Sequence, residues 1–329
     1  MESLIFAINA VSPIIVTVAV GYFLKRIGLM KADFAKAANK LVFRLLLPAM
    51  LFLNVYEIDS LSAFNFGYIG YVLIALITIF ALGIPLVMAV SDKGEKRGVL
   101  LQGIFRSNYA LVGIPLAQSL FGDEGALVAT LLSAFYVPAL NILAVVSLSI
   151  FRKGGSKPDV KKILLGIVKN PLIQSIALAF VFLGIRAIFE NVGIDFRISQ
   201  IPAIYTPLEY FKRSATPIAL LVLGAQFEFS AIKELRREII FGTFMRTFVV
   251  PVLGLGTAYL FFKGSFTGAH FAAFVAVFAT PVAVSSVPMA QEMEGDGALA
   301  GQLVVWTTLF SALSVFLASF LLKLAGIFA

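Results

Sequence analysis

The sequence predicts an all-α membrane protein with ten transmembrane helices, arranged as two related halves of five helices each. Three observations support this fold class: an extreme composition, ten long apolar runs, and a repeated segment. The chain is 60% hydrophobic and 13% charged, and its mean hydropathy is +0.98. So little polar surface cannot cover a water-soluble domain of this size.

The ten apolar runs are each roughly 20 residues long, which is the length that crosses about 30 Å of hydrocarbon. The first run has no basic region and no small-residue cleavage signal before its apolar stretch, so we expect a retained span rather than a signal peptide. Lys169, Lys212 and Arg213 interrupt the sixth and seventh runs. The expected spans are 4–24, 35–56, 67–90, 99–120, 126–151, 163–189, 205–227, 239–262, 269–293 and 298–322.

Charge predicts the orientation, because cytoplasmic loops hold the excess of Lys and Arg. With the N-terminus outside, 16 basic residues fall in loops on one side of the membrane and 4 on the other. We therefore expect a multi-pass protein of the cell inner (plasma) membrane, with both termini outside the cytoplasm. The basic loop 152–162 is then a cytoplasmic hinge between a first half, 1–151, and a second half, 163–329.

The repeated segment occupies the fourth and ninth spans. Residues 105–123 read FRSNYALVGIPLAQSLFGD, and residues 278–296 read FATPVAVSSVPMAQEMEGD. A helix-breaking or polar residue interrupts each copy, Asn108 with Pro115 in the first and Pro281 with Pro288 in the second. Such interruptions at matching positions of two halves are typical of the binding site of a secondary transporter. The identical pairs are Phe105/Phe278, Ala110/Ala283, Pro115/Pro288, Ala117/Ala290, Gln118/Gln291, Gly122/Gly295 and Asp123/Asp296.

The two halves are expected to be inverted relative to each other. Five spans is an odd number, so the second half enters the membrane from the opposite side, with a pseudo-two-fold axis in the membrane plane. The second and seventh spans support this pairing, because Arg-x-x-x-Pro recurs as Arg44/Pro48 and Arg213/Pro217.

Neither a cofactor nor a metal centre is predicted. The chain has no cysteine and a single histidine, His270, which argues against thiolate or histidine-based metal sites. No paired nucleophile and base is present, so an enzyme is not expected. The net charge of +8 lies in short loops, where the positive-inside rule explains it better than nucleic-acid binding does.

Four stretches in order along the chain carry a resemblance to a known family. They begin at residues 21, 107, 214 and 279 and include FAKAANKLVFRLLLPAMLF, SNYALVGIPLAQSLFG, SATPIALLVLGAQF and ATPVAVSS. These stretches resemble the auxin efflux carrier family, the bacterial permeases related to plant PIN proteins. The resemblance implies a ten-span transporter whose broken helices 4 and 9 cross, a fold also seen in sodium–bile acid symporters and sodium–proton antiporters.

The same resemblance implies how the spans are divided. Spans 1, 2, 6 and 7 would form a scaffold that usually forms a homodimer, and spans 3–5 and 8–10 a transport domain that moves as an elevator. The expected partners are the lipid bilayer and a small organic anion. Plant members carry indole-3-acetate, and bacterial members are commonly described as malate or malonate permeases.

The breaks in the fourth and ninth spans are expected to meet inside the protein, because lipid cannot satisfy freed backbone groups. Half-helix N-termini there would suit a carboxylate. The resemblance implies that Asn108 is a substrate-contacting amide and that Pro281 is the crossover proline; at Ser107 the chain departs from plant members, which carry proline. The candidate substrate-binding residues are Arg106, Ser107, Asn108, Pro281, Val282, Ser285 and Ser286, and the candidate crossover or hinge residues are Gly113, Pro115 and Pro288.

Other charged residues have two interpretations. Arg106 is either a functional intramembrane cation or a side chain that snorkels to the surface. Arg44 and Arg246 are expected to be snorkelling anchors. Lys212 and Arg213 are expected to balance Glu209 in a structural cluster, and His270 to lie at the interface.

Two alternatives to an organic-anion transporter remain open. A cation–proton antiporter needs mid-membrane carboxylates, and none of the 18 acidic residues falls at the centre of a span. A channel or a non-transporting sensor would need a filter loop or an output domain, and neither is recognisable. The coupling ion, the direction of transport and the choice of anion stay open.

Overall fold

The computed structural model describes residues 2–57, 66–151, 165 and 168–328. Apart from turns and one isolated β-bridge, the regular structure in these ranges is helical. The first half contains α1 (Glu2–Arg26), α2 (Ala32–Leu41), η1 (Val42–Leu46), α3 (Leu47–Tyr56), α4 (Phe66–Val90), α5 (Gly94–Phe105), η2 (Tyr109–Gly113) and α6 (Ile114–Ile150). The expected hinge loop, 152–162, lies outside the described residues.

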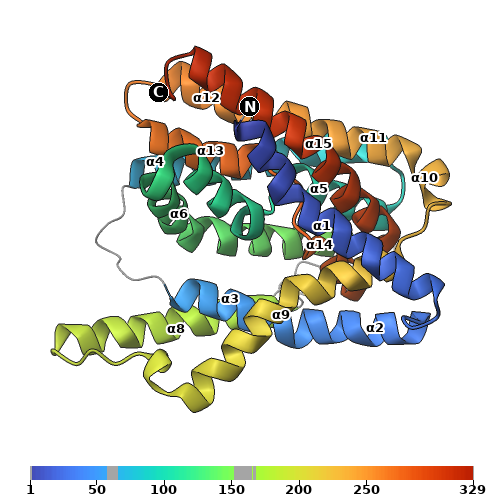
Figure 1. Cartoon of the computed structure of the whole chain (residues 1–329), viewed down its shortest axis with the longest axis horizontal. Coiled ribbons are helices and arrows are strands. Elements are labelled where there is room, and N and C mark those ends of the chain that lie inside the picture. The colour runs from blue at the N-terminus through green and yellow to red at the C-terminus, as the bar shows by residue number, and fades with distance from the viewer. Residues whose placement is uncertain (1, 58–65, 152–164, 166–167, 329) are drawn as a thin grey trace.

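The second half contains a similar series of helices (Figure 1). It comprises α8 (Pro171–Asn191), η3 (Ile198–Gln200), α9 (Pro202–Gln226), α10 (Ala231–Glu234), α11 (Arg236–Phe244), η4 (Met245–Val249), α12 (Val250–Phe262), α13 (Gly268–Phe278), α14 (Ser286–Glu292) and α15 (Gly297–Leu324).

Within the described residues, six helical segments are long and apolar enough to cross a membrane. The protein is therefore an all-helical membrane protein, as its composition predicts. The count of ten spans stays a prediction. The six segments are 32–56, 66–90, 109–150, 171–190, 236–262 and 297–324.

Both copies of the repeat end where one helical segment turns into the next. In the first copy the turn is a sharp kink within α6, where Phe121 leaves the helical region and Gly122 has a φ of +60°. Gly122 can adopt this conformation because it has no Cβ. In the second copy the turn lies between α14 and α15, and the Asp296 side chain caps α15 by accepting a hydrogen bond from the Leu299 N–H at 2.9 Å.

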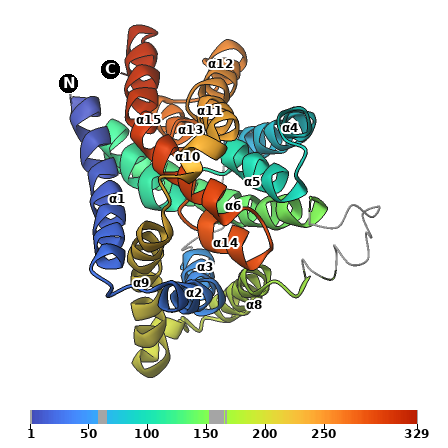
Figure 2. The ribbon, with the colours of Figure 1, turned by 90° about the vertical axis from the view of Figure 1, so that its right-hand side faces the viewer.

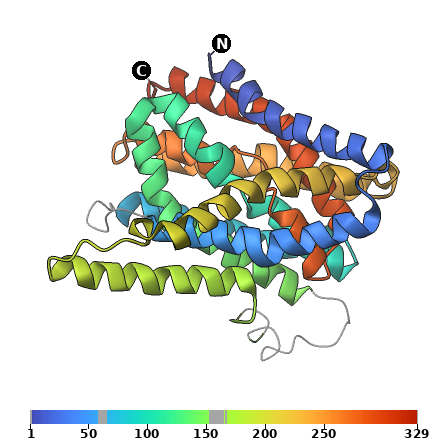
Figure 3. The ribbon, with the colours of Figure 1, turned by 60° about the horizontal axis from the view of Figure 1, so that its bottom comes forward.

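The helices form two groups in space. In Figure 1, α2, α3, α8 and α9 lie together along the lower side, and α4–α6 and α11–α15 lie above them. Helix α3 packs against α8 and α9, while α1 packs against both α9 and α15, as the turned view in Figure 2 also shows. The first turn of α1 and the last turn of α15 lie at the same end of the molecule (Figure 3).

Helices α1 and α9 approach closely because each has a glycine that faces the backbone of the other helix. A Cβ added to Gly21 would overlap the Leu221 carbonyl, and one added to Gly224 would overlap the Val18 carbonyl. Small residues that let backbones approach are typical of helix packing in membranes, where association depends on van der Waals contact.

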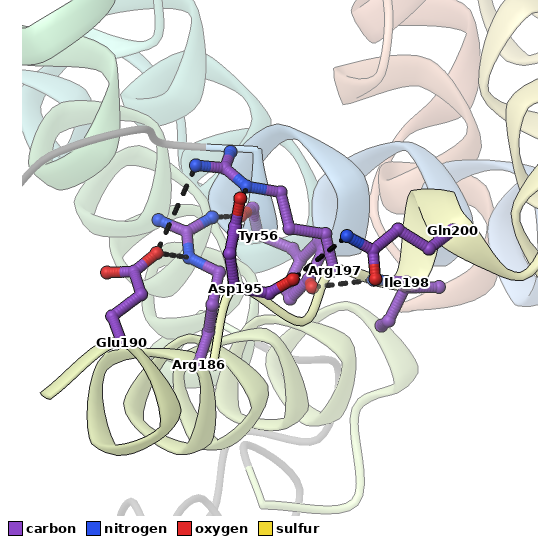
Figure 4. A network of polar contacts seen from close by, with 7 residues as sticks. All are labelled: Tyr56, Arg186, Glu190, Asp195, Arg197, Ile198 and Gln200. Atoms are coloured by element: carbon purple, nitrogen blue, oxygen red, sulfur yellow. Dashed lines mark hydrogen bonds and ion pairs between the residues drawn. The ribbon is translucent and has the colours of Figure 1, made fainter. Parts of the chain in front are cut away.

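A polar network joins the ends of α3 and α8 (Figure 4). The Tyr56 carbonyl accepts a hydrogen bond from Arg186 Nη1, and the Tyr56 hydroxyl accepts one from the Ile198 N–H, both at 2.9 Å. Arg186 Nε also lies 3.3 Å from Glu190 Oε1. The network attaches the segment between α8 and α9 to the end of α3.

Candidate functional site

The two breaks in the repeated segments lie against each other. Helix α5 ends at Phe105, and the chain between α13 and α14 is not helical over 279–285. The Asn108 N–H donates to the Pro281 carbonyl at 2.8 Å, and the Ala283 N–H donates to the Arg106 carbonyl at 3.2 Å. Ser107 and Val282 thereby form an antiparallel bridge. Each break supplies partners for backbone groups that the other has freed, which lipid could not do.

Different local chemistry produces the two breaks. Pro281 has no N–H to donate, and a proline disfavours helical geometry at the residue before it, Thr280. The first copy has no proline here, and Arg106 is extended, with φ −88° and ψ 99°. Tertiary contacts hold the side chains of Arg106 and Ser107. Arg106 donates to Asn141 Oδ1, and Ser107 Oγ lies 2.9 Å from the Tyr136 hydroxyl.

Arg106 is buried at the first break, with only 1% of its surface exposed. Its Nη1 also lies 3.2 Å from the sulfur of Met289. Among the residues that the structure describes, Arg106 has no ion-pair partner. A buried cation that only neutral groups stabilise favours an anion beside it. The neutral acceptors are Gln102 Oε1 at 2.8 Å, Asn141 Oδ1 at 2.7 Å, Ser285 Oγ at 3.0 Å and Ser286 Oγ at 3.3 Å.

A cavity of about 660 Å³ lies beside the first break. One wall comes from the breaks and from α6, and includes Arg106 and Asn108. The opposite wall comes mainly from α1, α3 and α9. It is mostly apolar, but it includes Thr216 and the charged residues Lys212 and Arg213 of α9. The cavity therefore lies between the two breaks and the helices that pack across from them.

Asn108 has a hydrogen-bond donor to spare. Its Nδ2 is buried and makes no hydrogen bond within the protein. The amide nitrogen of Gln102, whose oxygen accepts from Arg106, is also buried and without a hydrogen-bond partner. An unsatisfied buried donor is costly. Asn108 and Arg106 both line the cavity.

Comparison with known proteins places this chain in a family. The sequence model of a family described as "membrane transport protein" matches residues 6–319. The chain belongs to this family. The match confirms the resemblance to the auxin efflux carriers, and the protein is a transporter by family.

Two archaeal relatives are transporters by name. The chain is 24% identical over 314 residues to an uncharacterized transporter of Methanothermobacter thermautotrophicus. This alignment covers 93% of this chain and 95% of the relative. The chain is also 28% identical over 228 residues to the uncharacterized transporter MJ1031 of Methanocaldococcus jannaschii. That alignment covers 67% of this chain and 68% of the relative.

The structure brings part of the predicted site of this transporter to the cavity. Arg106, Ser107, Asn108 and Ser285 line it. Ser286 is buried behind them and accepts from Arg106. The remaining predicted residues lie outside the lining: Pro281 and Val282 are part of the backbone bridge between the breaks.

The predicted hinge residues lie after the breaks rather than at them. Gly113 is the last residue of η2, Pro115 lies in the first turn of α6, and Pro288 lies inside α14. Pro115 and Pro288 therefore do not lie at the breaks themselves, and their role as hinges stays a prediction.

Arg246 is the functional candidate that the sequence interpretation missed. It was expected to be a snorkelling anchor, but only 1% of it is exposed, and its guanidinium hydrogen-bonds to backbone carbonyls at the breaks. The available signal was a cation within an apolar run, which is a functional candidate by default. Asn141, the partner of Arg106, was missed as well.

The other charged residues have structural partners. Arg213 pairs with Glu209 at 2.8 Å, as expected, but Lys212 pairs with Glu57 instead. The exposed Arg44 lies 3.7 Å from Glu292. His270 helps to cap the start of α13 together with Thr267. Within the described residues no group of three or more His, Cys, Asp or Glu could hold a metal ion.

Proposed function

We propose that this protein is a secondary transporter that moves a small organic anion across the membrane, with the carboxylate of the substrate held by Arg106 and Asn108. The observation that carries the proposal is Arg106 itself. It is a buried cation without an acidic partner among the described residues, and it lines a cavity large enough for a substrate.

The chemistry of the site suits a carboxylate. A guanidinium presents several N–H donors in a planar fork that matches carboxylate geometry. The spare amide donor of Asn108 adds directionality. The volume, about 660 Å³, lies in the range of small-molecule sites, and the apolar wall suits an organic body. The candidate substrates are an auxin-like indole acid and a malate- or malonate-like dicarboxylate.

The mechanism proposed is alternating access of the elevator type. In this proposal, α1–α3, α8 and α9 are the scaffold, and the remaining helices are the transport domain. The chain as a whole consists of two inverted repeats of five spans, and helices 4 and 9 cross. The position of the cavity supports the division, since its walls come from both groups. The repeats are 1–151 and 163–329, joined by a cytoplasmic loop, with both termini outside.

The alternative of a cation–proton antiporter is less well supported. That activity needs a carboxylate in the binding site. No Asp or Glu is among the described residues that line the cavity. The described residues include no soluble output domain of the kind that a sensor would use.

A homodimer through the scaffold in the lipid bilayer completes the proposal. Large apolar side chains on α8 are exposed, including Leu178, Val181 and Ile188, and must be covered by lipid or by another chain. Light scattering of the purified protein, corrected for detergent, tests this: a dimer is expected to have twice the mass of the single chain.

The function is tested by uptake into liposomes that contain the purified protein. Malate, malonate and indole-3-acetate are offered to the wild type, to Arg106→Met, and to Arg26→Met as a matched control whose guanidinium is exposed and lies over the Tyr22 ring. We expect saturable uptake of one acid by the wild type and the control, and none by Arg106→Met.

The outcomes separate the class from the site. If Arg106→Met, shown by gel filtration to be folded, transports like the wild type, the site is wrong. If no acid moves under any ion gradient, the organic-anion function is wrong.

A further inference from the structure

A second buried arginine, which does not line the cavity, contacts the two breaks. Arg246, in η4, donates from Nε to the Thr280 carbonyl and from Nη2 to the Val277 carbonyl, both at 2.8 Å. Its Nη1 lies 3.4 Å from the Ile104 carbonyl. One side chain thus contacts both broken segments, since Ile104 belongs to α5 and Val277 to α13.

The three carbonyls lie at helix C-termini, or directly after one. Helix α5 ends at Phe105 and α13 at Phe278, so the carbonyls of Ile104 and Val277 are in the last turns. Carbonyls there have no helical partner and carry the negative end of the helix dipole. Two such ends that face one position in a membrane interior form a site for a cation. In other secondary transporters with interrupted helices, unwound carbonyls and half-helix C-termini coordinate sodium.

Arg246 and Arg106 differ in their access to the substrate cavity. Arg106 is part of the cavity lining, whereas Arg246 is not. Neither has an ion-pair partner among the described residues. The contacts of Arg106 are side chains that an anion can supplement, while those of Arg246 are backbone carbonyls, which only a cation or a donor can satisfy.

We propose that Arg246 is a built-in cation that takes the place of a coupling metal ion between the broken helices. The proposal rests on the proposed function and deepens it. Because a tethered guanidinium already occupies the carbonyl site, uptake of the anion does not need sodium there. Arg246 is a positioning residue: it holds the C-terminal ends of α5 and α13 together, so that Arg106 and Asn108 keep their geometry.

The test is rescue by small cations after the guanidinium is removed. Uptake is measured for the wild type, for Arg246→Ala and for Arg237→Ala, in choline medium and after addition of sodium or guanidinium ions, at fixed membrane potential. Arg237 is the control because it is an exposed arginine on α11, the helix that leads into η4. We expect wild type and Arg237→Ala to be indifferent to the cation.

In Arg246→Ala, uptake in choline is expected to fall by roughly tenfold or more, because buried carbonyls lose a charged donor. Sodium or guanidinium should restore a large part of it. Wild-type uptake that depends on sodium would overturn the proposal, as would an Arg246→Ala protein that works normally in choline. A loss in folded Arg246→Ala that neither ion restores would also overturn it.

Arg246→Lys and thermal melting keep the test decisive if Arg246→Ala does not fold or if no substrate is found. The lysine variant retains the charge, so its uptake should stay independent of sodium and exceed that of Arg246→Ala; an equal loss in both contradicts the proposal. Without any substrate, sodium or guanidinium should raise the Tm of purified Arg246→Ala more than that of the wild type or of Arg246→Lys. Equal shifts would contradict the built-in cation, whereas a lack of uptake by the wild type would contradict only the proposed function.

Discussion

Arg106 and Arg246 are both buried arginines, yet their neighbours differ, and the roles we propose for them differ accordingly. Arg106 is surrounded by side-chain amides and hydroxyls and borders a cavity. Arg246 is enclosed by backbone carbonyls. The first can exchange a neutral partner for an anionic one, and the second cannot. The function of a buried arginine therefore follows from its acceptors rather than from its charge alone.

Replacement of Asn108 by alanine is the sharpest residue-scale prediction. The change removes the spare amide donor beside Arg106, and a hydrogen bond to a charged group contributes about 1.5–3 kcal/mol. Since about 1.4 kcal/mol is a factor of ten in affinity, we expect the KM for the transported anion to rise by roughly tenfold or more. Initial rates of uptake over a range of concentrations measure this.

Gln118→Ala is the control for Asn108→Ala. Gln118 is an exposed amide in the same repeated segment and does not line the cavity. Its KM should match the wild type. An unchanged KM in Asn108→Ala would remove Asn108 from the site and leave the role of Arg106 standing.

At the scale of elements, the breaks lie where tertiary contacts replace helical hydrogen bonds. The first break contains no proline, and the N–H of Asn108 donates to the Pro281 carbonyl instead of to a carbonyl of the preceding helix. Pro115 and Pro288, the residues most typical of helix breaks, lie inside helices. Proline content alone therefore predicts that a break exists nearby, but not the residue at which the helix stops.

The close contact of α1 with α9 leads to a prediction about stability. In Gly224→Ala the new methyl group would overlap the Val18 carbonyl, so the two helices must move apart. Overpacking of this kind costs about 1–3 kcal/mol, and we expect a lower Tm of the purified protein. Fluorescence-detected thermal melting in detergent measures it.

Gly184→Ala is the matched control for Gly224→Ala. Gly184 lies on α8, and a Cβ there meets no atom within 4 Å. Alanine is the better helix former by up to about 1 kcal/mol, so the Tm should stay constant or rise. Equal losses in the two variants would contradict the proposed close packing of α1 on α9.

At the scale of the whole molecule, the cavity lies between two groups of helices. Thr216, on α9, and Ser285, before α14, both line it. A transport cycle that moves one group against the other changes the exposure of these walls. Because the chain contains no cysteine, a single introduced thiol reports on this exposure without any background.

Thr216→Cys is expected to react with a charged, water-soluble thiol reagent, and bound substrate is expected to slow the reaction. The reason is that Thr216 is partly exposed and lines the cavity, whose walls also include the charged side chains of Lys212 and Arg213. Leu178→Cys is the control, since Leu178 lies exposed on the outer face of α8, where lipid excludes charged reagents. Equal labelling of both, with no protection by substrate, would contradict a substrate cavity at this place.

The proposed orientation predicts opposite labelling of two loops in intact cells. Ser265→Cys, between α12 and α13, should react with an impermeant reagent from outside, because the N-terminus is proposed to be external. Asp92→Cys, between α4 and α5, should react only after the cells are opened. The reverse pattern would invert the topology, and labelling of both from outside would contradict the count of spans between them.

Much of this protein could be predicted from its sequence, because the relevant signals are local or repeated. Composition identifies a membrane protein, and the repeat locates the interrupted segments that contain Arg106 and Asn108. Only the tertiary structure decided that the two breaks hydrogen-bond to each other, that Arg246 reaches the Thr280 carbonyl, and that α9 forms the opposite wall of the cavity. The physical reason is that an apolar run determines where a helix can lie in lipid, whereas the partners of its few polar groups depend on which helices pack together, and no local pattern encodes that packing.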